Sequence, residues 1–537
     1  MMKKDHLVKI VCFFLYFSLV ITTCCNTDTQ RIQNNTYEIP HIEGKTNIID
    51  LDQEEIPASE MQIMEEITSN ETPIADTPIV GGTPYHEPND AIEFNDLYFK
   101  KALLESLDKN NRDDITYAEV AEITVLKINS LDIKDMTEIK YFPALKTLTC
   151  YTIRLEYIDL SNCTELESLI CDNNQLASLD VSNCSKLVDL SCTSGNLTSL
   201  DLTNCTSLKR LDCYNNQITN LDVSKCPELI QLSCSNNLLD FLDITANSEL
   251  TALGCRFNNL TSIDVSNCLK LVKMDCSHNR LTDINIANCT ELEELSCSWN
   301  LIASLDVTKC SKLSTIECGS NKLVSMDIVN CLKLKKLNCG NNQITELDIT
   351  KCTKLIGVWC HNNQLTNLDV SKCPDLMSIV CFNNQIAVLD TKKCKKIKAL
   401  LCYDNQLKSL DLLKCTQLWQ LWCGNNQFAD LDISKCIKLE ELLCEDNQLT
   451  GLDVSACIAL LSLDCTNNQL SVLDVSKCAT LKELFCSGNQ LTRLDISKCT
   501  SLNYLDCSSN KLTSLIASDY ANWQDFIYYD NPIANIK

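Results

Sequence analysis

Residues 166–186 read Leu-Glu-Ser-Leu-Ile-Cys-Asp-Asn-Asn-Gln-Leu-Ala-Ser-Leu-Asp-Val-Ser-Asn-Cys-Ser-Lys, and this unit decides the fold. Near its start, apolar Leu169 and Cys171 alternate with three residues expected to point outward, Ser168, Ile170 and Asp172. A period of two is typical of a strand with one buried face. The unit is too short to bury that face alone, so it predicts one turn of a longer coil.

The unit repeats every 21 residues without a slip. One cysteine column runs from Cys150 to Cys507, and a second runs from Cys163 to Cys499 with Asn247 as its single interruption. Together they hold all but three of the 37 cysteines. A fixed internal period takes precedence over any domain count drawn from a length of 537 residues, so we expect a single solenoid whose strands pair in parallel.

Two polar columns accompany the cysteines. An asparagine such as Asn174 is expected to turn inward, because its amide can both donate to and accept from buried backbone groups at the bend. An aspartate such as Asp180 lies between Leu179 and Val181, which we expect to form a second extended stretch on the outer side. Stacked carboxylates repel one another, so each is expected to accept a backbone N–H of the following turn. A metal-binding ladder of aspartates is the alternative.

The cysteines admit three interpretations. Disulfides along a column fit poorly, since neighbouring coils hold Cβ atoms about 4.8 Å apart and a disulfide needs roughly 3.5–4.5 Å. Metal ligation lacks Cys-x-x-Cys spacing and nearby histidines. We therefore expect free thiols that serve as small core residues, with no metal and no cofactor.

The unit resembles the leucine-rich repeat with cysteine in place of its third leucine. With its preceding cap, the chain is similar to secreted and surface-exposed bacterial proteins of the internalin-like kind. The resemblance implies an α/β-type repeat solenoid, a right-handed coil with a parallel inner β-sheet and short extended and turn segments outside. We expect it to span residues 125–537 and to end in an aromatic cover formed by Tyr520, Trp523, Phe526, Tyr528 and Tyr529.

The N-terminus indicates export. Residues 1–24 place two lysines before a short apolar run, which is the layout of a signal peptide. The stretch Ile21-Thr22-Thr23-Cys24 resembles the lipobox of bacterial lipoproteins, which implies lipidation of Cys24, or of Cys25, and anchoring to the outer membrane or cell surface. A soluble exported product is the alternative. Residues 25–92 are rich in Glu, Thr, Asn and Pro and are expected to form a flexible tether.

Residues 93–124 are expected to form a helical cap over the first coil. Helices are predicted over 94–107 and 117–122, the first with an apolar face formed by Leu97, Ala102, Leu103 and Leu107. The intervening loop from Asp108 to Glu119 resembles an EF-hand calcium loop, but Arg112 stands where a ligand belongs. We expect a plain turn there.

Charge and residue distribution favour a binding protein. A formal net charge of −25 opposes nucleic-acid binding. The five histidines are scattered and the cysteines point inward, so no catalytic set is predicted. We expect a protein ligand on the inner sheet; a glycan ligand and a structural spacer without a specific ligand are the alternatives.

The outward strand positions locate the predicted site. The residue before each strand cysteine is mostly polar until Trp359, then apolar as far as Leu443, and aromatic or histidine residues follow the cysteine over the same coils. Such surfaces are typical of binding hot spots. The predicted ligand-binding residues, called the strip below, are Trp359, His361, Val380, Phe382, Leu401, Tyr403, Trp422 and Leu443. Cover of the strip by the tether or by self-association is the alternative, and a weaker second cluster comprises Phe257, His278 and Trp299.

Overall fold

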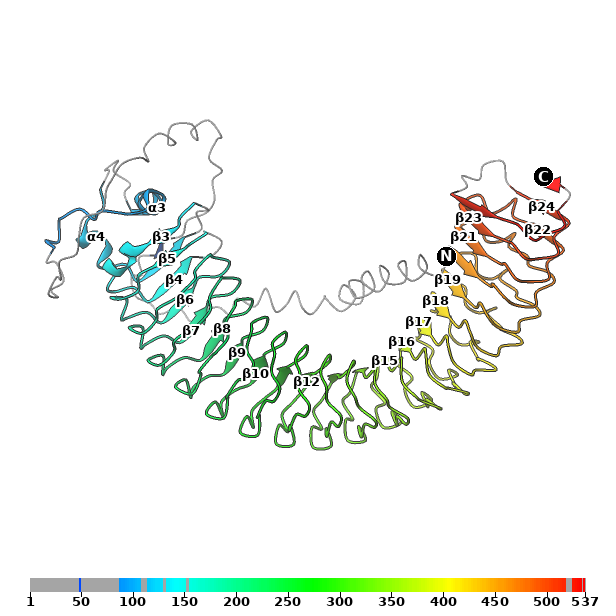
Figure 1. Ribbon diagram of the computed structural model, residues 1–537, viewed down its shortest axis with the longest axis horizontal. Coiled ribbons are helices and arrows are strands. Elements are labelled where there is room, and N and C mark those ends of the chain that lie inside the picture. The colour runs from blue at the N-terminus through cyan, green and yellow to red at the C-terminus, as the bar shows by residue number, and fades with distance from the viewer. Residues whose placement is uncertain are drawn as a thin grey trace, which may run out of the picture. The chain divides into compact units, whose positions relative to one another are not determined.

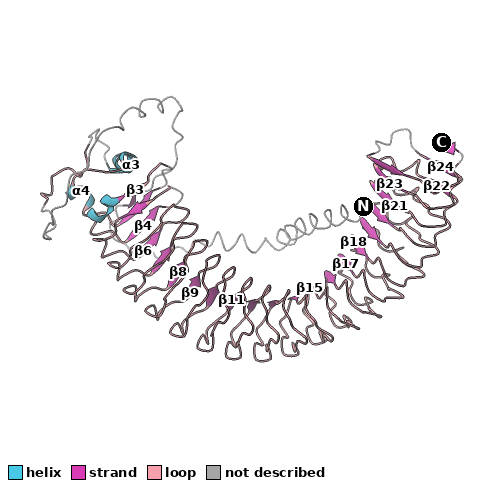
Figure 2. Ribbon diagram, in the orientation of Figure 1, coloured by secondary structure: helices cyan, strands magenta, loops and turns pink. Residues whose placement is uncertain are grey.

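The computed structural model of the protein describes residues 48–49, 86–107, 114–128, 132–150, 154–517, 524–533 and 535–536. The predicted signal peptide, Cys24 and most of the predicted tether lie outside these residues. In the repeat region, successive coils stack side by side, and one short strand of each coil lies along the inner edge of the stack (Figures 1 and 2).

The inner sheet has 21 strands, and each pairs in parallel with the strand of the neighbouring coil. Most strands are three residues long and recur at the repeat period. In coil order they are β1 (Ile48–Ile49), β2 (Val125–Ile128), β4 (Thr147–Cys150), β6 (Ser168–Ile170), β7 (Asp189–Ser191), β8 (Arg210–Asp212), β9 (Gln231–Ser233), β10 (Ala252–Gly254), β11 (Lys273–Asp275), β12 (Glu294–Ser296), β13 (Thr315–Glu317), β14 (Lys336–Asn338), β15 (Gly357–Trp359), β16 (Ser378–Val380), β17 (Ala399–Leu401), β18 (Gln420–Trp422), β19 (Glu441–Leu443), β20 (Ser462–Asp464), β21 (Glu483–Phe485), β23 (Tyr504–Asp506) and β25 (Asp525–Ile527). The predicted parallel inner sheet is confirmed.

The outer side of the coils is less regular than the inner side. Among the described residues, strands form there only near the two ends, as β3 (Asp135–Met136) with β5 (Tyr157–Ile158), and as β22 (Arg493–Asp495), β24 (Ser514–Ile516) and β26 (Asn535–Ile536). Between them, the described coils show a single bridge, Asp180 to Asp201. The predicted second extended stretch is therefore a regular strand only near the ends of the stack.

Two helices and a 3₁₀ turn lie before and beside the first coils: α3 (Leu97–Leu107), α4 (Tyr117–Val120) and η1 (Thr137–Tyr141). α3 starts one residue after Asp96, whose carboxylate accepts the backbone N–H groups of Tyr98 and Phe99 at 2.8 and 3.1 Å. The buried face therefore carries Phe99 and Leu103, whereas Leu97 is 61% exposed. The prediction for Leu97 was wrong, because it occupies the helix's first turn and points away from the coils.

The folded region begins before residue 93. The backbone N–H of Ile92 donates to the carbonyl of Ile115 at 2.8 Å, and the Ile92 side chain is buried. β1 also pairs with the start of β2. The Glu119 carboxylate accepts the Thr116 N–H at 2.9 Å and caps α4, while residues 108–113 of the calcium-like loop lie outside the described residues.

The C-terminal end keeps the repeat register. β25 pairs with β23, and Phe526 packs against the core. Tyr528 and Tyr529 are 43% and 57% exposed, and the Tyr528 ring lies 4.8 Å from the Phe526 ring. Tyr520 and Trp523 lie outside the described residues.

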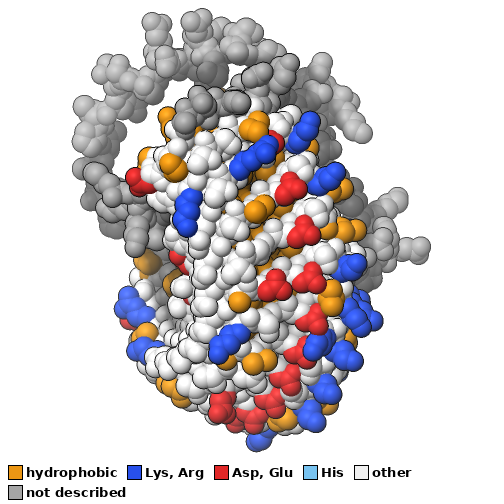
Figure 3. Space-filling model, turned by 90° about the vertical axis from the view of Figure 1, so that its right-hand side faces the viewer, with side chains coloured by type: hydrophobic (Ala, Val, Ile, Leu, Met, Phe, Trp, Pro, Cys, Tyr) orange, Lys and Arg blue, Asp and Glu red, His pale blue; other side chains and the backbone are white. Residues whose placement is uncertain are grey.

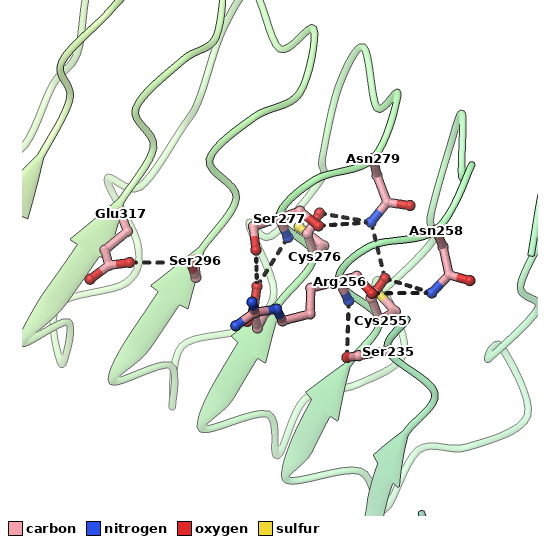
Figure 4. A network of polar contacts seen from close by, with 10 residues as sticks. Ser235, Cys255, Arg256, Asn258, Cys276, Ser277, Asn279, Ser296 and Glu317 are labelled. Atoms are coloured by element: carbon pink, nitrogen blue, oxygen red, sulfur yellow. Dashed lines mark hydrogen bonds and ion pairs between the residues drawn. The ribbon is translucent and has the colours of Figure 1, made fainter. Parts of the chain in front are cut away.

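The asparagines bind buried backbone groups at the bend, as predicted, and they also bond to the coil before their own, although Gly195 interrupts the column. Asn342 Oδ1 accepts the backbone N–H of Leu323 at 2.9 Å, and its Nδ2 donates to the carbonyls of Cys318 and Cys339 at 3.1 and 3.0 Å. Asn258 and Asn279 make the same bonds nearer the start of the stack (Figure 4). One side chain thus satisfies groups that the bend would otherwise leave buried without partners.

The aspartates of the column accept backbone hydrogen bonds within their own turn. Asp180 Oδ1 accepts the backbone N–H of Ser182 at 2.9 Å, and Asp306 does the same for Thr308 at 2.9 Å. Hydrogen bonds from Ser182 keep the pKa of Asp180 below its usual value despite its neighbours. The predicted local role is confirmed.

Both cysteine columns consist of buried free thiols. In the second column the thiol donates a long hydrogen bond to the preceding coil, as from Cys373 Sγ to the carbonyls of Ile349 and Cys352 at 3.6 and 3.5 Å. Asn247 replaces a cysteine of this column, and its Nδ2 donates to the corresponding carbonyls of Val223 and Cys226 at 3.1 and 2.7 Å. The interruption therefore preserves the column's hydrogen bonds.

Candidate binding surface

The strip residues that precede the strand cysteines form one continuous row. Trp359 pairs with Val380, Val380 with Leu401, Leu401 with Trp422, and Trp422 with Leu443, on the consecutive strands β15 to β19. Since Cβ atoms alternate between the two faces of a strand, all five side chains leave the same face of the sheet. Asn338 and Asp464 border the row at its two ends.

The residues that follow the cysteines form a second row beside the first. The His361 and Phe382 rings stack with centroids 4.7 Å apart, and the Phe382 and Tyr403 rings stack at 4.4 Å. The Tyr403 ring lies 6.3 Å from the Trp422 ring, which joins the two rows. The structure therefore brings all eight predicted residues together on β15 to β19 and the turns that follow them.

The strip is a small cluster of its own, separate from the continuous core inside the coils. Val380, Phe382 and Leu401 are buried, as is their neighbour Ala399. Trp359, Tyr403 and Trp422 pack against them and are half-buried. The central side chains of the strip are therefore covered by their own neighbours.

Glycines make room for three side chains that lie flat on the sheet. The His361 ring lies over Gly340, the Trp359 ring over Gly357, and the Glu445 carboxylate over Gly424. A Cβ atom at any of these glycines would collide with the side chain above it. These side chains are therefore seated in places that only glycine leaves open.

The polar members of this surface were not among the residues predicted from the sequence. Gln420 is fully buried, and its Nε2 donates to Glu441 Oε2 at 2.7 Å. Trp422 Nε1 donates to the same oxygen at 3.3 Å. Gln420 and Glu441 stand two residues before Trp422 and Leu443, so the period of two places them on the same face and could have revealed them.

Within the described part of the chain, four buried polar atoms of this surface have no hydrogen-bond partner: Trp359 Nε1, His361 Nδ1, Gln420 Oε1 and Glu445 Oε2. An unpartnered buried polar atom costs about 1–3 kcal/mol. The first two belong to the coil of β15, and the other two belong to the coils of β18 and β19. The surface thus has an unsatisfied polar group at each end of an apolar middle.

Burial shifts the pKa values of three side chains on this surface. It lowers the pKa of His361 to about 4, so the ring is neutral at neutral pH. Burial, followed by the charge of Asp464, raises the pKa of Glu445 to about 8. Burial also raises the pKa of the Tyr403 phenol well above its usual value.

The second aromatic cluster lies at the bend. Phe257, His278 and Trp299 have positive φ angles of 51°, 53° and 58°, a region that disfavours bulky residues. Their rings stack with centroids 4.0 and 5.4 Å apart, and we call them the ring stack. Most other coils have Asn, Asp, Ser or Gly at this position. Trp299 is 59% exposed, so the ring stack lies on the surface and is not part of the core.

Other features of the surface indicate no further chemistry. Figure 3, turned by 90° from Figure 1, shows acidic side chains in a row across successive coils with basic side chains beside them. Such a row is expected where the same position of the repeat carries the same residue type. Among the described residues, no group of histidine, cysteine and acidic side chains could hold a metal ion. The same residues include no helix long and apolar enough to cross a membrane. His278 and His361 lie on coils four repeats apart and cannot act together.

Comparisons with known proteins agree with this architecture. Residues 332–373 and 479–522 match the family model described as Leucine Rich repeats (2 copies). The functional domain of InlJ from Listeria monocytogenes, described as including a cysteine ladder, is 28% identical, with 78% of this chain and 80% of that chain covered and a TM-score of 0.56. No curated protein matches the sequence.

Two other solved structures share the fold. YopM from Yersinia enterocolitica is 23% identical, with 78% of this chain and 90% of that one covered and a TM-score of 0.63. The Arabidopsis receptor kinase HAESA, solved with the peptide hormone IDA and the co-receptor SERK1, is 19% identical, with 76% and 78% covered and a TM-score of 0.64. The chain is therefore a solenoid of leucine-rich repeats, structurally similar to InlJ.

Proposed function

We propose that the protein is a cell-surface binding protein and that the strip holds a protein partner. The observation that carries this proposal is the apolar cluster on the outward face of β15 to β19, which lies apart from the core. Outward strand positions contribute nothing to the interior of a coil, so fold stability does not require apolar residues there. Half-buried Trp359, Tyr403 and Trp422 are the residue types that dominate protein interfaces.

Similarity to known proteins supports a protein ligand. HAESA has the same fold and was solved with a peptide hormone and a co-receptor. The strip's mixture of aromatic rings with a few polar atoms suits a polypeptide. We propose no catalytic role, since the polar groups around the strip belong to a single apolar surface and include no nucleophile beside a base.

Cross-linking in the native surroundings would test this proposal. A photoreactive phenylalanine analogue would replace Tyr403 in the strip, and in a control it would replace Tyr214, which stands in the same column on the coil of β8. We expect a cross-linked polypeptide from position 403 only. Combining the analogue with Trp422→Ala and Leu443→Ala should abolish that product, whereas adding Trp299→Ala should not.

Other products would contradict the proposal. Identical products from positions 403 and 214 would show that contact is unspecific. Cross-links to glycan alone would favour the glycan alternative, and cross-links to the chain itself would show that the tether or a second copy covers the strip.

We also propose export and anchoring through a lipid on Cys24. The support is the signal-like layout of residues 1–24 and the lipobox-like stretch before Cys24. Labelled fatty acid should be incorporated into the intact chain and into Cys25→Ser, but not into Cys24→Ser. Labelling that is lost only in Cys25→Ser would move the anchor by one residue, and an unlabelled intact chain would indicate a soluble exported product.

A further inference from the structure

We propose that the strip binds an extended peptide segment with a basic side chain at one end, an apolar middle, and an acidic or carbonyl-rich end. The inference rests on the proposed function and names the class of partner. It is carried by the polarity of the four unpartnered atoms: the N–H groups lie at the β15 end and the oxygen atoms at the β18 and β19 end.

The donor end is formed by one coil. Trp359 Nε1 can only donate. Asn341 Nδ2 lies 3.4 Å from His361 Nε2 and also donates to Ser320 Oγ, while Asn341 Oδ1 accepts from Asn362. Since that amide nitrogen donates, Nε2 accepts, and the neutral ring carries its proton on Nδ1. Two unpartnered N–H groups therefore lie at this end of the strip, and a carboxylate or carbonyl oxygen would satisfy them.

The acceptor end is formed by oxygens. Gln420 Oε1 and Glu445 Oε2 have no partner, because the Gln420 amide group is held by Glu441 and the Glu445 carboxylate lies over Gly424. Beside burial, the charges of Asp464, Asp446 and Asp404 raise the pKa of Glu445. A buried carboxyl group among carboxylates is complemented by a cation, and the nearby Tyr403 ring offers a face that attracts one.

The distance between the two ends determines the length of the segment. From the coil of β15 to the coils of β18 and β19, which hold Gln420 and Glu445, is three to four steps of about 4.8 Å, or about 14–19 Å. An extended chain covers about 3.3 Å per residue, so about five residues reach from one end to the other. Val380, Phe382 and Leu401 would lie beneath the middle of such a segment.

The chain itself does not supply a suitable occupant. Residues 26–85 contain Arg31 and Lys45 as their only arginine and lysine, against many Asp and Glu. A second copy would bring a further formal charge of −25 to an acidic surface. Charge complementarity therefore favours a segment of another protein that carries a basic side chain at one end.

Binding of blocked five-residue peptides to the full chain would test the inference. The probes are Asp-Leu-Val-Leu-Lys, Lys-Leu-Val-Leu-Lys, Asp-Leu-Val-Leu-Asp and Ser-Leu-Val-Leu-Ser, each with a fluorophore for anisotropy. We expect the Asp–Lys peptide to bind most tightly, the Lys–Lys peptide about tenfold more weakly, and the other two at least about a hundredfold more weakly. Equal binding of the Ser–Ser peptide, or tightest binding of the Asp–Asp peptide, would overturn the inference.

Variation of pH gives an independent readout. An ammonium group binds the ionised form of Glu445, whose pKa in the free protein is about 8. Affinity for the Asp–Lys peptide should therefore rise by up to about tenfold per pH unit toward about pH 8 and then level off. His361 and Tyr403 stay neutral throughout this range, so neither of them produces the same profile.

Two variants complete the test. Glu445→Gln should flatten the pH profile and weaken binding at least about tenfold above about pH 8, whereas Glu440→Gln, an exposed acidic residue of the same coil, should change neither. An unchanged profile in Glu445→Gln would overturn the inference. If cross-linking at position 403 depends on Trp422 and Leu443 while the peptides bind alike, the proposed function stands and the peptide class is wrong.

Discussion

The interior columns and the strip lie on opposite faces of the same strands and follow different rules. Inward positions of β15 to β19 carry Val358, Ile379, Leu400, Leu421 and Leu442, all fully buried and similar in size. On the outward face, the position just before each strand cysteine carries an aromatic or aliphatic residue in these strands, whereas in most other coils it carries Asp, Ser, Glu or Asn. A 21-residue coil limits what its interior holds, but nothing in the coil limits its outward face. A change of composition on the outward face therefore reports what the surface contacts.

The largest loss of stability should come from raising the pH, which acts on the buried thiols of the interior. Burial raises the pKa of Cys150 and Cys163 from an ordinary 9.0 to about 12, and the other thiols of both columns are raised in the same direction. The thiols stay neutral in the folded chain but ionise in the unfolded chain as pH rises through 9.0. Each then lowers the free energy of unfolding by about 1.4 kcal/mol per pH unit.

Because each regular coil contains two such thiols, unfolding under reducing conditions should be complete by about pH 10. Circular dichroism and thiolate absorbance should change together. Thiolate absorbance that rises near pH 9.0 while circular dichroism remains native would contradict the buried columns.

A smaller but still large effect is expected from the asparagine column. Asn342→Ala leaves the Leu323 N–H and the carbonyls of Cys318 and Cys339 without a hydrogen-bond partner. Each unpartnered group should lower the free energy of unfolding by about 1–3 kcal/mol. Chemical denaturation should show a loss of several kcal/mol, whereas Lys335→Ala, an exposed side chain beside β14, should change stability by less than about 0.5 kcal/mol. Equal denaturation midpoints for the two variants would contradict the hydrogen-bonding role of Asn342.

The two faces can be compared directly by truncating one side chain on each. Leu400→Ala opens a cavity inside the coil and should cost about 2–5 kcal/mol. Phe382→Ala removes a larger side chain, but it lies on the surface and leaves no enclosed cavity. The loss of stability should therefore stay near the free energy of burying the side chain, about 1.5–3 kcal/mol. A greater loss from Phe382→Ala than from Leu400→Ala would make the strip a second core and not a binding surface.

The smallest effect concerns the ring stack. Trp299 has a φ of 58°, where a residue other than Gly, Asn or Asp costs about 1–2 kcal/mol. Trp299→Ala and Trp299→Asn both remove the ring and its stacking on His278, but only Asn relieves the backbone. The Asn variant should therefore be more stable than the Ala variant by about 1 kcal/mol in denaturation. Equal stabilities would show that the bend tolerates any side chain.

Much of the fold followed from local patterns, because each coil repeats the same short-range chemistry. The alternation around Leu169 predicted the strand, and the unsatisfied backbone at the bend predicted the role of the asparagines such as Asn342. The local bond from Asp180 to the Ser182 N–H could also be predicted from the sequence. Leu97 was assigned wrongly because the start of α3 depends on Asp96, which also accepts the Lys134 N–H from a distant part of the chain.

By itself, the sequence determined the period, the parallel sheet, the inward columns and the place of the strip, since each depends on spacing along one coil. Only the tertiary structure decided that the strip shields its own centre, that Gly340, Gly357 and Gly424 seat the side chains above them, and that Gln420 and Glu445 belong to it. The physical reason is that burial and hydrogen bonding at these sites depend on side chains 19 to 21 residues apart. Spacing brings such residues together, but only packing determines which polar atoms remain without a partner.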